Sequence, residues 1–189
     1  MTALQTVWFP KPGRLLLLWM LALFPAADIQ AQPPAGSEYQ VKAAFIYHFA
    51  RFTQWPEGSL PEPDSPLVLC VITSEPDADV LFSLRDKAVR DHRLVVRKPE
   101  SAAEISDCHL LYLATEDMEV IRRGLALARG RPILTVGEAS GFLQLGGVIN
   151  FFEREQRLRF AVNLDAAEAA GLKFSSQLLM SAEIIQEGP

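Results

Sequence analysis

The stretch PLVLCVI, from Pro66 to Ile72, decides the fold class because it is a nearly continuous apolar run of strand length. A strand buried on both faces of a parallel sheet reads this way, whereas a strand with one solvated face alternates apolar and polar residues. The next segment, TSEPDADVLFSLRDK, predicts a helix with Thr73 or Ser74 as its N-cap. The buried stripe of this helix is expected to be Val80, Leu81 and Leu84.

The alternation of strand and helix continues toward the C-terminus. Three further strands are expected in HRLVVRK, CHLLYLA and PILTVG, which cover residues 92–98, 108–114 and 132–137. Between them, PESAAEI predicts a short helix, and EDMEVIRRGLALARG predicts a longer one with acids in its first turn and Arg129 in its last. Strands separated by helices favour right-handed crossovers and a sheet covered on both faces.

The alternation of strands and helices ends near the C-terminus of the chain. GGVINFFERE and RLRFAVN are strand-like runs joined by polar residues around Gln156, which predicts an antiparallel hairpin. The closing segment LDAAEAAGLKFSSQLLMSAEII predicts one or two helices with a break at Gly171. The predicted fold class is therefore α/β, a three-layer sandwich with a mostly parallel sheet of about six strands flanked by helices and a C-terminal antiparallel hairpin.

The N-terminus has the features of an export signal. Lys11 and Arg14 precede the apolar run LLLLWMLALF, from Leu15 to Phe24, which small residues follow. This run is short for a membrane span and typical of a secretory signal peptide, with cleavage expected near Ala31. We therefore expect a signal peptide over residues 1–31 and a single domain over residues 32–189 that works in the periplasm; an uncleaved membrane anchor is the alternative.

Charge and cysteine content narrow the choice of partners. The 189 residues carry a net charge of −5 with no cluster of Lys and Arg, which argues against nucleic acid and against a polybasic membrane surface. Cys70 and Cys108 both lie in the exported part, where an even pair suggests a disulfide, with two free thiols as the alternative. A metal site is disfavoured because strand alternation would send His109 to the face opposite Cys108.

The helix expected at the start of the domain is apolar on two sides, and only one of them can pack against the sheet. EYQVKAAFIYHFARFTQWP, from Glu38 to Pro56, has apolar residues in most helical directions and therefore no wide solvent face. Its aromatic side chains could reach a second protein or subunit, since aromatic residues contribute strongly to interfaces. Alternatively, the closing helices or the Pro-rich loop after Pro56 cover this side. The interface candidates are Phe45, Tyr47, Phe49 and Trp55.

The sequence contains no assembled catalytic set. The glycines of TVGEASGFLQLGG match neither dinucleotide-binding nor P-loop spacing, and turn glycines are the better interpretation. His48, His92 and His109 belong to three separate elements, and no nucleophile-elbow sequence occurs. We therefore expect no catalytic residues, no metal and no cofactor.

A ligand pocket is still possible, because ligands of open parallel sheets collect at the carboxyl ends of the strands. Those ends carry polar groups and a turn glycine that could line such a pocket, although the same residues also serve as ordinary caps and turns. They are Thr73, Ser74, Thr115, Gly137 and Glu138.

Several of these segments together resemble a known family. AAFIYHFARFTQWP, PLVLCVI, CHLLYL and GGVINFF followed by LRFAVNLDAAEAAGLKFSSQLL are similar, in content and order, to the YfiR-like family of exported bacterial proteins. The resemblance covers nearly all of residues 38–185. It implies a non-catalytic periplasmic regulator, a homodimer, that binds and represses the periplasmic part of a membrane diguanylate cyclase and so controls cyclic-di-GMP and biofilm formation.

The resemblance also implies an outer-membrane lipoprotein that captures the regulator, and it matches Cys70 and Cys108 to a disulfide of the family. Family members occur beside other membrane sensors as well. The alternative function is therefore a periplasmic small-molecule sensor that acts with a membrane histidine kinase.

Overall fold

The computed structural model describes residues 35–60 and 65–185. The expected signal peptide and its cleavage site near Ala31 lie outside these residues. Among the helices that are described, none combines the length and the apolar character needed to span a bilayer.

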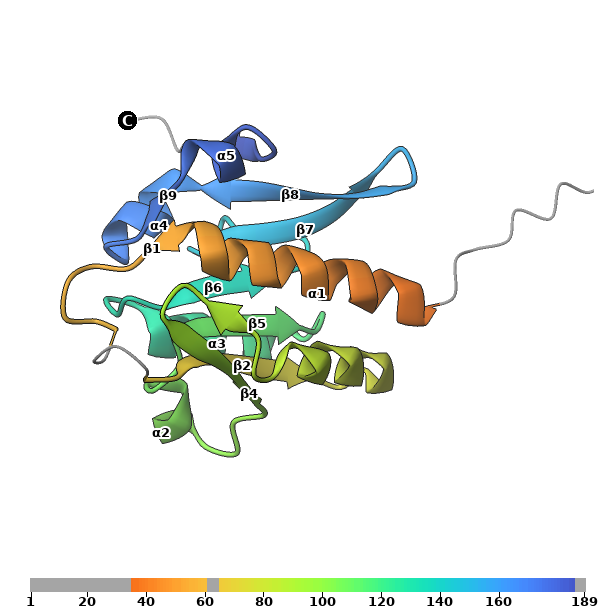
Figure 1. The fold of residues 1–189 in the computed structure, drawn as a ribbon. Coiled ribbons are helices and arrows are strands. Elements are labelled where there is room, and N and C mark those ends of the chain that lie inside the picture. Colours follow the sequence, from red (N-terminus) through yellow and green to blue (C-terminus); the bar gives the residue numbers. More distant parts are fainter. Residues whose placement is uncertain (1–34, 61–64, 186–189) are drawn as a thin grey trace, which may run out of the picture. The chain divides into compact units, whose positions relative to one another are not determined.

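An eight-stranded sheet forms the centre of the domain, in the order β10-β8-β7-β6-β5-β2-β4-β3 (Figure 1). Its five parallel neighbours are β4 (His92–Arg97), β2 (Leu67–Thr73), β5 (Leu110–Ala114), β6 (Leu134–Gly137) and β7 (Ile149–Arg154). The antiparallel members are β8 (Arg157–Asn163) against β7 and the two-residue β3 (Ala88–Val89) against β4, while β10 (Glu183–Ile185) runs parallel to β8. The mostly parallel sheet and the antiparallel hairpin are confirmed.

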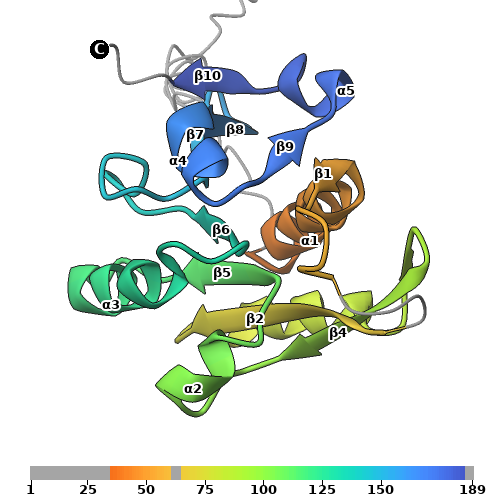
Figure 2. The same ribbon diagram turned by 90° about the vertical axis from the view of Figure 1, so that its left-hand side faces the viewer.

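Helices cover both faces of the sheet. One apolar cluster joins the sheet to α1 (Ala35–Phe52), η1 (Pro76–Leu84), α4 (Leu164–Ala169) and α5 (Ser176–Leu179). A second cluster joins the opposite face to α2 (Ala102–Ile105) and α3 (Met118–Ala128). Figure 2 shows α3 and α1 on opposite sides of the strands, so the predicted three-layer arrangement is confirmed.

The burial of β2 on both faces explains why its sequence is continuously apolar. Leu67, Leu69 and Val71 belong to the cluster on the α1 side, whereas Val68 and Cys70 belong to the cluster on the α3 side. Because both faces of this central strand are buried, neither set of alternate residues can be polar.

The helix predicted after β2 is a 3-10 helix rather than an α-helix. Its fully buried residues are Ala78, Leu81 and Leu84, each three positions from the next, which matches the three residues per turn of a 3-10 helix. Val80 is only half-buried. The expected N-cap is also wrong: Glu75 occupies that position without a side-chain bond, and the Thr73 hydroxyl accepts a hydrogen bond from the Glu75 backbone N–H.

A second, two-stranded sheet escaped the sequence analysis. β1 (Thr53–Gln54) pairs in antiparallel register with β9 (Lys173–Phe174). The Ser175 backbone N–H extends this pairing by donating to the Phe52 carbonyl. The end of α1 is therefore fastened to the C-terminal part of the chain.

The inner side of α1 rests on the hairpin of β7 and β8 through aromatic rings. Phe49 lies with its ring centroid 4.9 Å from that of Phe160 and 5.6 Å from that of Phe151. Phe45 lies 5.5 Å from Phe160 on the same measure. Both flanks of α1 are covered as well, because the helix contacts η1 and α5. The alternative that closing helices cover part of its second side is therefore correct, with η1 as an additional cover.

Candidate functional site

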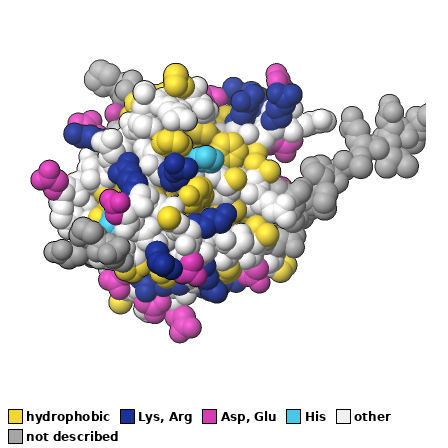
Figure 3. All heavy atoms as spheres, in the orientation of Figure 1, with side chains coloured by type: hydrophobic (Ala, Val, Ile, Leu, Met, Phe, Trp, Pro, Cys, Tyr) yellow, Lys and Arg dark blue, Asp and Glu magenta, His cyan; other side chains and the backbone are white. Residues whose placement is uncertain are grey.

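A narrow stripe of α1 remains open to solvent. We call Val41, Ala44, His48 and Arg51, which are exposed at helical spacing, the outer face of α1. Val41 is 46% exposed. In Figure 3, hydrophobic side chains gather over α1 with a few basic side chains among them. An exposed helix face of this composition is a candidate protein-binding surface.

The four aromatic interface candidates differ in accessibility. Phe49 is 1% exposed and belongs to the core, so the prediction that it could present a surface is wrong for this residue. Phe45, Tyr47 and Trp55 are half-buried and pack at the edges of the main apolar cluster. Their role in an interface stays a prediction.

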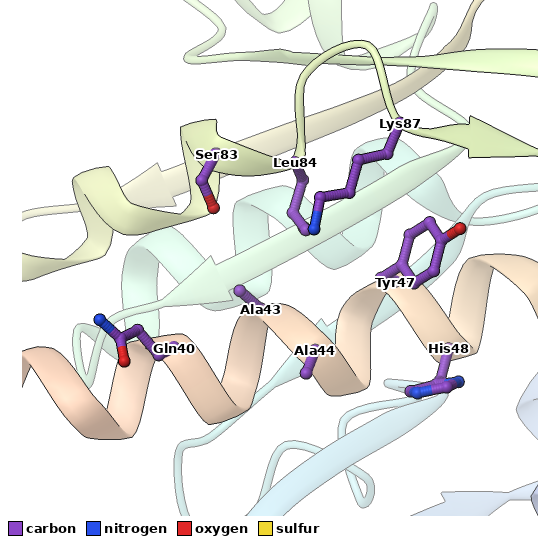
Figure 4. A pocket seen from close by; sticks show the side chains of 8 residues that line it. All are labelled: Gln40, Ala43, Ala44, Tyr47, His48, Ser83, Leu84 and Lys87. Carbon is purple, nitrogen blue, oxygen red and sulfur yellow. The ribbon is translucent and has the colours of Figure 1, made fainter.

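A groove of about 180 Å³ runs between α1 and η1. Its floor contains buried Ala43 and Leu84, and Figure 4 shows the Lys87 ammonium and the Ser83 hydroxyl directed from the η1 side toward α1. The complete lining consists of Gln40, Ala43, Ala44, Tyr47, His48, Ser83, Leu84 and Lys87. The groove therefore combines an apolar floor with polar groups at its rim.

Cations surround the Tyr47 ring at one end of this groove. The Lys87 ammonium lies 5.6 Å and the Arg51 guanidinium 5.8 Å from the ring centroid, both within the range of cation–π attraction. The Tyr47 hydroxyl donates to the Ala88 carbonyl at 2.8 Å, which fixes the ring, and Arg90 donates to the Arg51 carbonyl at the end of α1. Within the part of the chain that the structure describes, none of these three cations pairs with a carboxylate.

The N-terminal half of α1 carries a buried ionic network. Lys42 is only 6% exposed, and its Nζ lies 2.5 Å from Glu138 Oε2 and 2.7 Å from Glu38 Oε1. The fully buried Tyr112 donates its hydroxyl to the same Glu138 oxygen at 2.9 Å. Lys42 also lies over the Tyr39 ring, 4.7 Å from its centroid. This network joins α1 to the middle of β5 and to the carboxyl end of β6.

The network raises the pKa values of Lys42, Tyr39 and Tyr112. Burial alone would lower the pKa of Lys42, but hydrogen bonds to Glu138 and Glu38 outweigh burial and raise it. Burial, reinforced by the negative charge of Glu138, raises the pKa of Tyr39 to about 12 and raises that of Tyr112 well above its usual range. At neutral pH the lysine is therefore charged and both phenols hold their protons.

The residues proposed for a strand-end pocket have individual local roles. The hydroxyls of Thr73 and Thr115 each accept a hydrogen bond from the backbone N–H two residues later, at 2.9 and 3.1 Å. Ser74 is exposed, and Glu138 belongs to the Lys42 network. None of these residues lines the groove between α1 and η1. The strand-end pocket therefore stays a prediction.

Gly137 is required by packing. A Cβ at Gly137 or at Gly147 would collide with the ring of Phe142, which is fully buried between these two glycines. Gly137 and Gly147 therefore make room for an aromatic ring, whereas Gly141 and Gly146 have positive φ angles, as expected of turn glycines.

The expected disulfide is present, but Cys108 lies outside β5, although a strand was expected over residues 108–114. Cys70 lies within β2, whereas Cys108 lies two residues before β5 begins, and the two Cα atoms are 5.8 Å apart. The neighbouring His109 accepts a hydrogen bond on Nδ1 from the Val68 backbone N–H at 3.0 Å. The Nδ1 atom of His109 is therefore engaged in a hydrogen bond with the backbone of β2.

A second hollow, of about 430 Å³, lies beside α4 and is bounded by Leu164, Ala167, Glu168, Gly171, Leu172, Lys173 and Phe174. Over residues 35–60 and 65–185, no group of three or more His, Cys, Asp or Glu side chains could hold a metal ion. The outer face of α1 and its groove therefore make up the candidate site.

The fold and this site define an α/β sandwich domain with an exposed helix face and an adjoining groove. The chain belongs to the YfiR/HmsC-like family, whose model matches residues 39–183. Among solved structures, the chain is similar to a conserved domain protein from Vibrio cholerae O1 biovar El Tor strain N16961, with 11% identity and a TM-score of 0.46. That alignment covers 77% of this chain and 60% of the Vibrio protein, so this chain spans less than two thirds of that protein's length.

Proposed function

We propose that this protein is a periplasmic, non-catalytic regulator that binds the periplasmic part of an inner-membrane diguanylate cyclase and represses it. Membership of the YfiR/HmsC-like family supports this proposal, because the members of the family are periplasmic regulators. Through its partner, the protein would control cyclic-di-GMP and biofilm formation.

The outer face of α1 is the observation that carries the proposal. Val41 is 46% exposed, and Ala44 and His48 continue the exposed stripe between half-buried Phe45 and Tyr47. A helix that the sheet, η1 and α5 already hold in place presents these side chains without further ordering. Pre-organised surfaces of this kind lose little conformational entropy on binding.

A matched pair of variants tests the proposal in cells. Ala44→Glu places a charge on the outer face of α1, whereas Ala126→Glu places the same charge on the exposed side of α3, on the opposite face of the sheet. We expect deletion of the gene to raise cyclic-di-GMP, and we expect the wild type and Ala126→Glu, but not Ala44→Glu, to reverse the rise. Thermal melts of both variants check that they fold.

The other outcomes are equally informative. Unchanged cyclic-di-GMP after deletion would exclude repression of a diguanylate cyclase and would favour a sensor that acts with a histidine kinase. A rise that both variants reverse would keep the regulator but would place its interface outside α1.

Two further partners follow from the family resemblance and belong to the same proposal. One is a second copy of the chain, which light scattering of the purified protein would detect. The other is an outer-membrane lipoprotein that removes the regulator from its membrane partner, which co-purification with a tagged regulator would test.

A further inference from the structure

The groove between α1 and η1 shares Ala44 with the outer face of α1 and adds three features that the proposed protein-binding role does not require. Its floor is apolar, since Ala43 and Leu84 are buried and Ala44 extends the floor outward. Its rim carries the Gln40 amide from α1, the Ser83 hydroxyl from η1 and the Lys87 ammonium from the segment between η1 and β3. Its volume of about 180 Å³ is bounded on both sides by helices.

The charge of the groove is opposite to that of the chain as a whole. The chain has a net charge of −5, yet the Lys87 ammonium makes no ion pair with any residue in the described ranges. Arg51 adds a second positive charge on the Tyr47 ring that closes this end of the groove. By contrast, the buried Lys42 has two carboxylate partners. The cations beside the groove are therefore available to an external anion.

The size of the groove limits the apolar part of a ligand. A cavity of about 150 Å³ holds one benzene molecule, and drug-sized ligands occupy pockets of about 300–1,000 Å³. The groove, at about 180 Å³ and open to solvent on one side, therefore has room for one six-membered ring with a short substituent that stays partly exposed. The adjoining ammonium and hydroxyl groups suit a carboxylate, since hydrogen bonds to ionised groups are the strong ones.

We propose that this groove binds a small aromatic carboxylate. The ring lies against Ala43, Ala44 and Leu84, and the carboxylate accepts hydrogen bonds from Lys87 and Ser83. This site stands on the contacts of the groove alone and holds whether or not the outer face of α1 binds a protein partner.

Nuclear magnetic resonance titration of the purified protein tests the site with phenylacetate as the probe. We expect saturable shifts in the backbone amides of Ala43, Ala44, Leu84 and Lys87. The uncharged analogue phenylacetamide is expected to bind at least about tenfold more weakly, because it keeps the ring and loses the charge. Acetate, which keeps the charge and loses the ring, is expected to cause no saturable shift.

A pair of lysine variants separates this site from general attraction to basic side chains. Lys87→Met is expected to weaken phenylacetate binding at least about tenfold. Lys98→Met removes the same charge from an exposed lysine that already pairs with Asp79, and it is expected to bind like the wild type. Absence of saturable shifts, equal binding by Lys87→Met, or equal binding of acetate would each overturn the proposal. Both variants are first compared with the wild type by thermal melting.

Discussion

Lys42 of α1 and Glu138, which directly follows β6, form a buried ion pair across 96 residues of sequence, with 2.5 Å between Nζ and Oε2. Tyr112 of β5 donates to the same carboxylate oxygen. The pair therefore fixes the position of α1 against the carboxyl end of β6 and, through Tyr112, against the middle of β5. Because the outer face and the groove are both built on α1, their geometry depends on this attachment.

Removal of one member of this pair should destabilise the fold. Glu138→Gln leaves Lys42 buried with Glu38 as its remaining carboxylate, and we expect a loss of about 3 kcal/mol in the free energy of unfolding, at the lower end for a broken buried pair. The double variant Lys42→Met/Glu138→Gln should recover part of this loss. Denaturant titration measures both values.

The exposed pair of Lys98 and Asp79 supplies the control. Its two side chains are largely solvated, so Lys98→Met should cost less than about 1 kcal/mol. A similar cost for Glu138→Gln and Lys98→Met would mean that the buried pair does not hold α1 in place.

Alkaline pH should destabilise the protein through the same network. Tyr39, Tyr112 and Lys42 all have raised pKa values in the folded state, so the unfolded chain loses these protons first as pH rises. The folded state then binds more protons than the unfolded state, and the free energy of unfolding falls as pH increases above about 10.

Tyr112→Phe tests this dependence, because it removes one of the three groups and leaves a similar shape. The variant should lose less stability between pH 9.5 and 12 than the wild type does, even though it is less stable at neutral pH. Equal alkaline slopes for the two proteins would contradict the assignment of the loss to this network.

The packing of Phe142 between two glycines gives a third prediction. Gly147→Ala should lower the free energy of unfolding by about 1–3 kcal/mol, because the added methyl group collides with the buried ring. Adding Phe142→Leu should restore part of the loss, since the smaller side chain leaves room for the methyl group. Ser140→Ala, at an exposed position in the same loop, is the control for thermal melting.

The disulfide gives a fourth prediction. Loss of the bridge by Cys70→Ser should lower the free energy of unfolding by about 4 kcal/mol, the chain-entropy value for cysteines 38 residues apart. Reductant should lower the melting temperature of the wild type and leave that of Cys70→Ser/Cys108→Ser unchanged. A wild-type melting temperature that reductant does not alter would show that the bridge contributes nothing to stability.

The sequence was sufficient for the layers of the fold and insufficient for its smallest strands. The composition of a long apolar run such as Leu67–Thr73 is enough to predict that the strand is buried. By contrast, β1, β3 and β9 have two residues each, and partners elsewhere in the chain create them. No local pattern of two residues distinguishes such a strand from a loop.

Lys42 was missed for a related reason. In the sequence it looks like the solvated side of a helix, because its partner Glu138 is remote. The available signal was a single lysine within an otherwise apolar helix, four residues after Glu38 and with no wide polar face around it. The groove could not be predicted either, because its second wall, η1, was expected to be an α-helix with a different buried stripe.

The attachment of α1 has a consequence for the order in which the chain can fold. The helix opens the described part of the chain, yet Phe151, Phe160 and the strand β9, against which it rests, lie more than a hundred residues later in the sequence. Such distant contacts form slowly and leave apolar surface uncovered in the meantime. Because synthesis proceeds from the N-terminus, α1 is made before the segments that cover it, and its contacts are complete only when β9 has been made. A chain that stops short of β7 would leave the aromatic side of α1 exposed, which makes this helix the segment that chaperones would have to shield until the rest of the domain has been made.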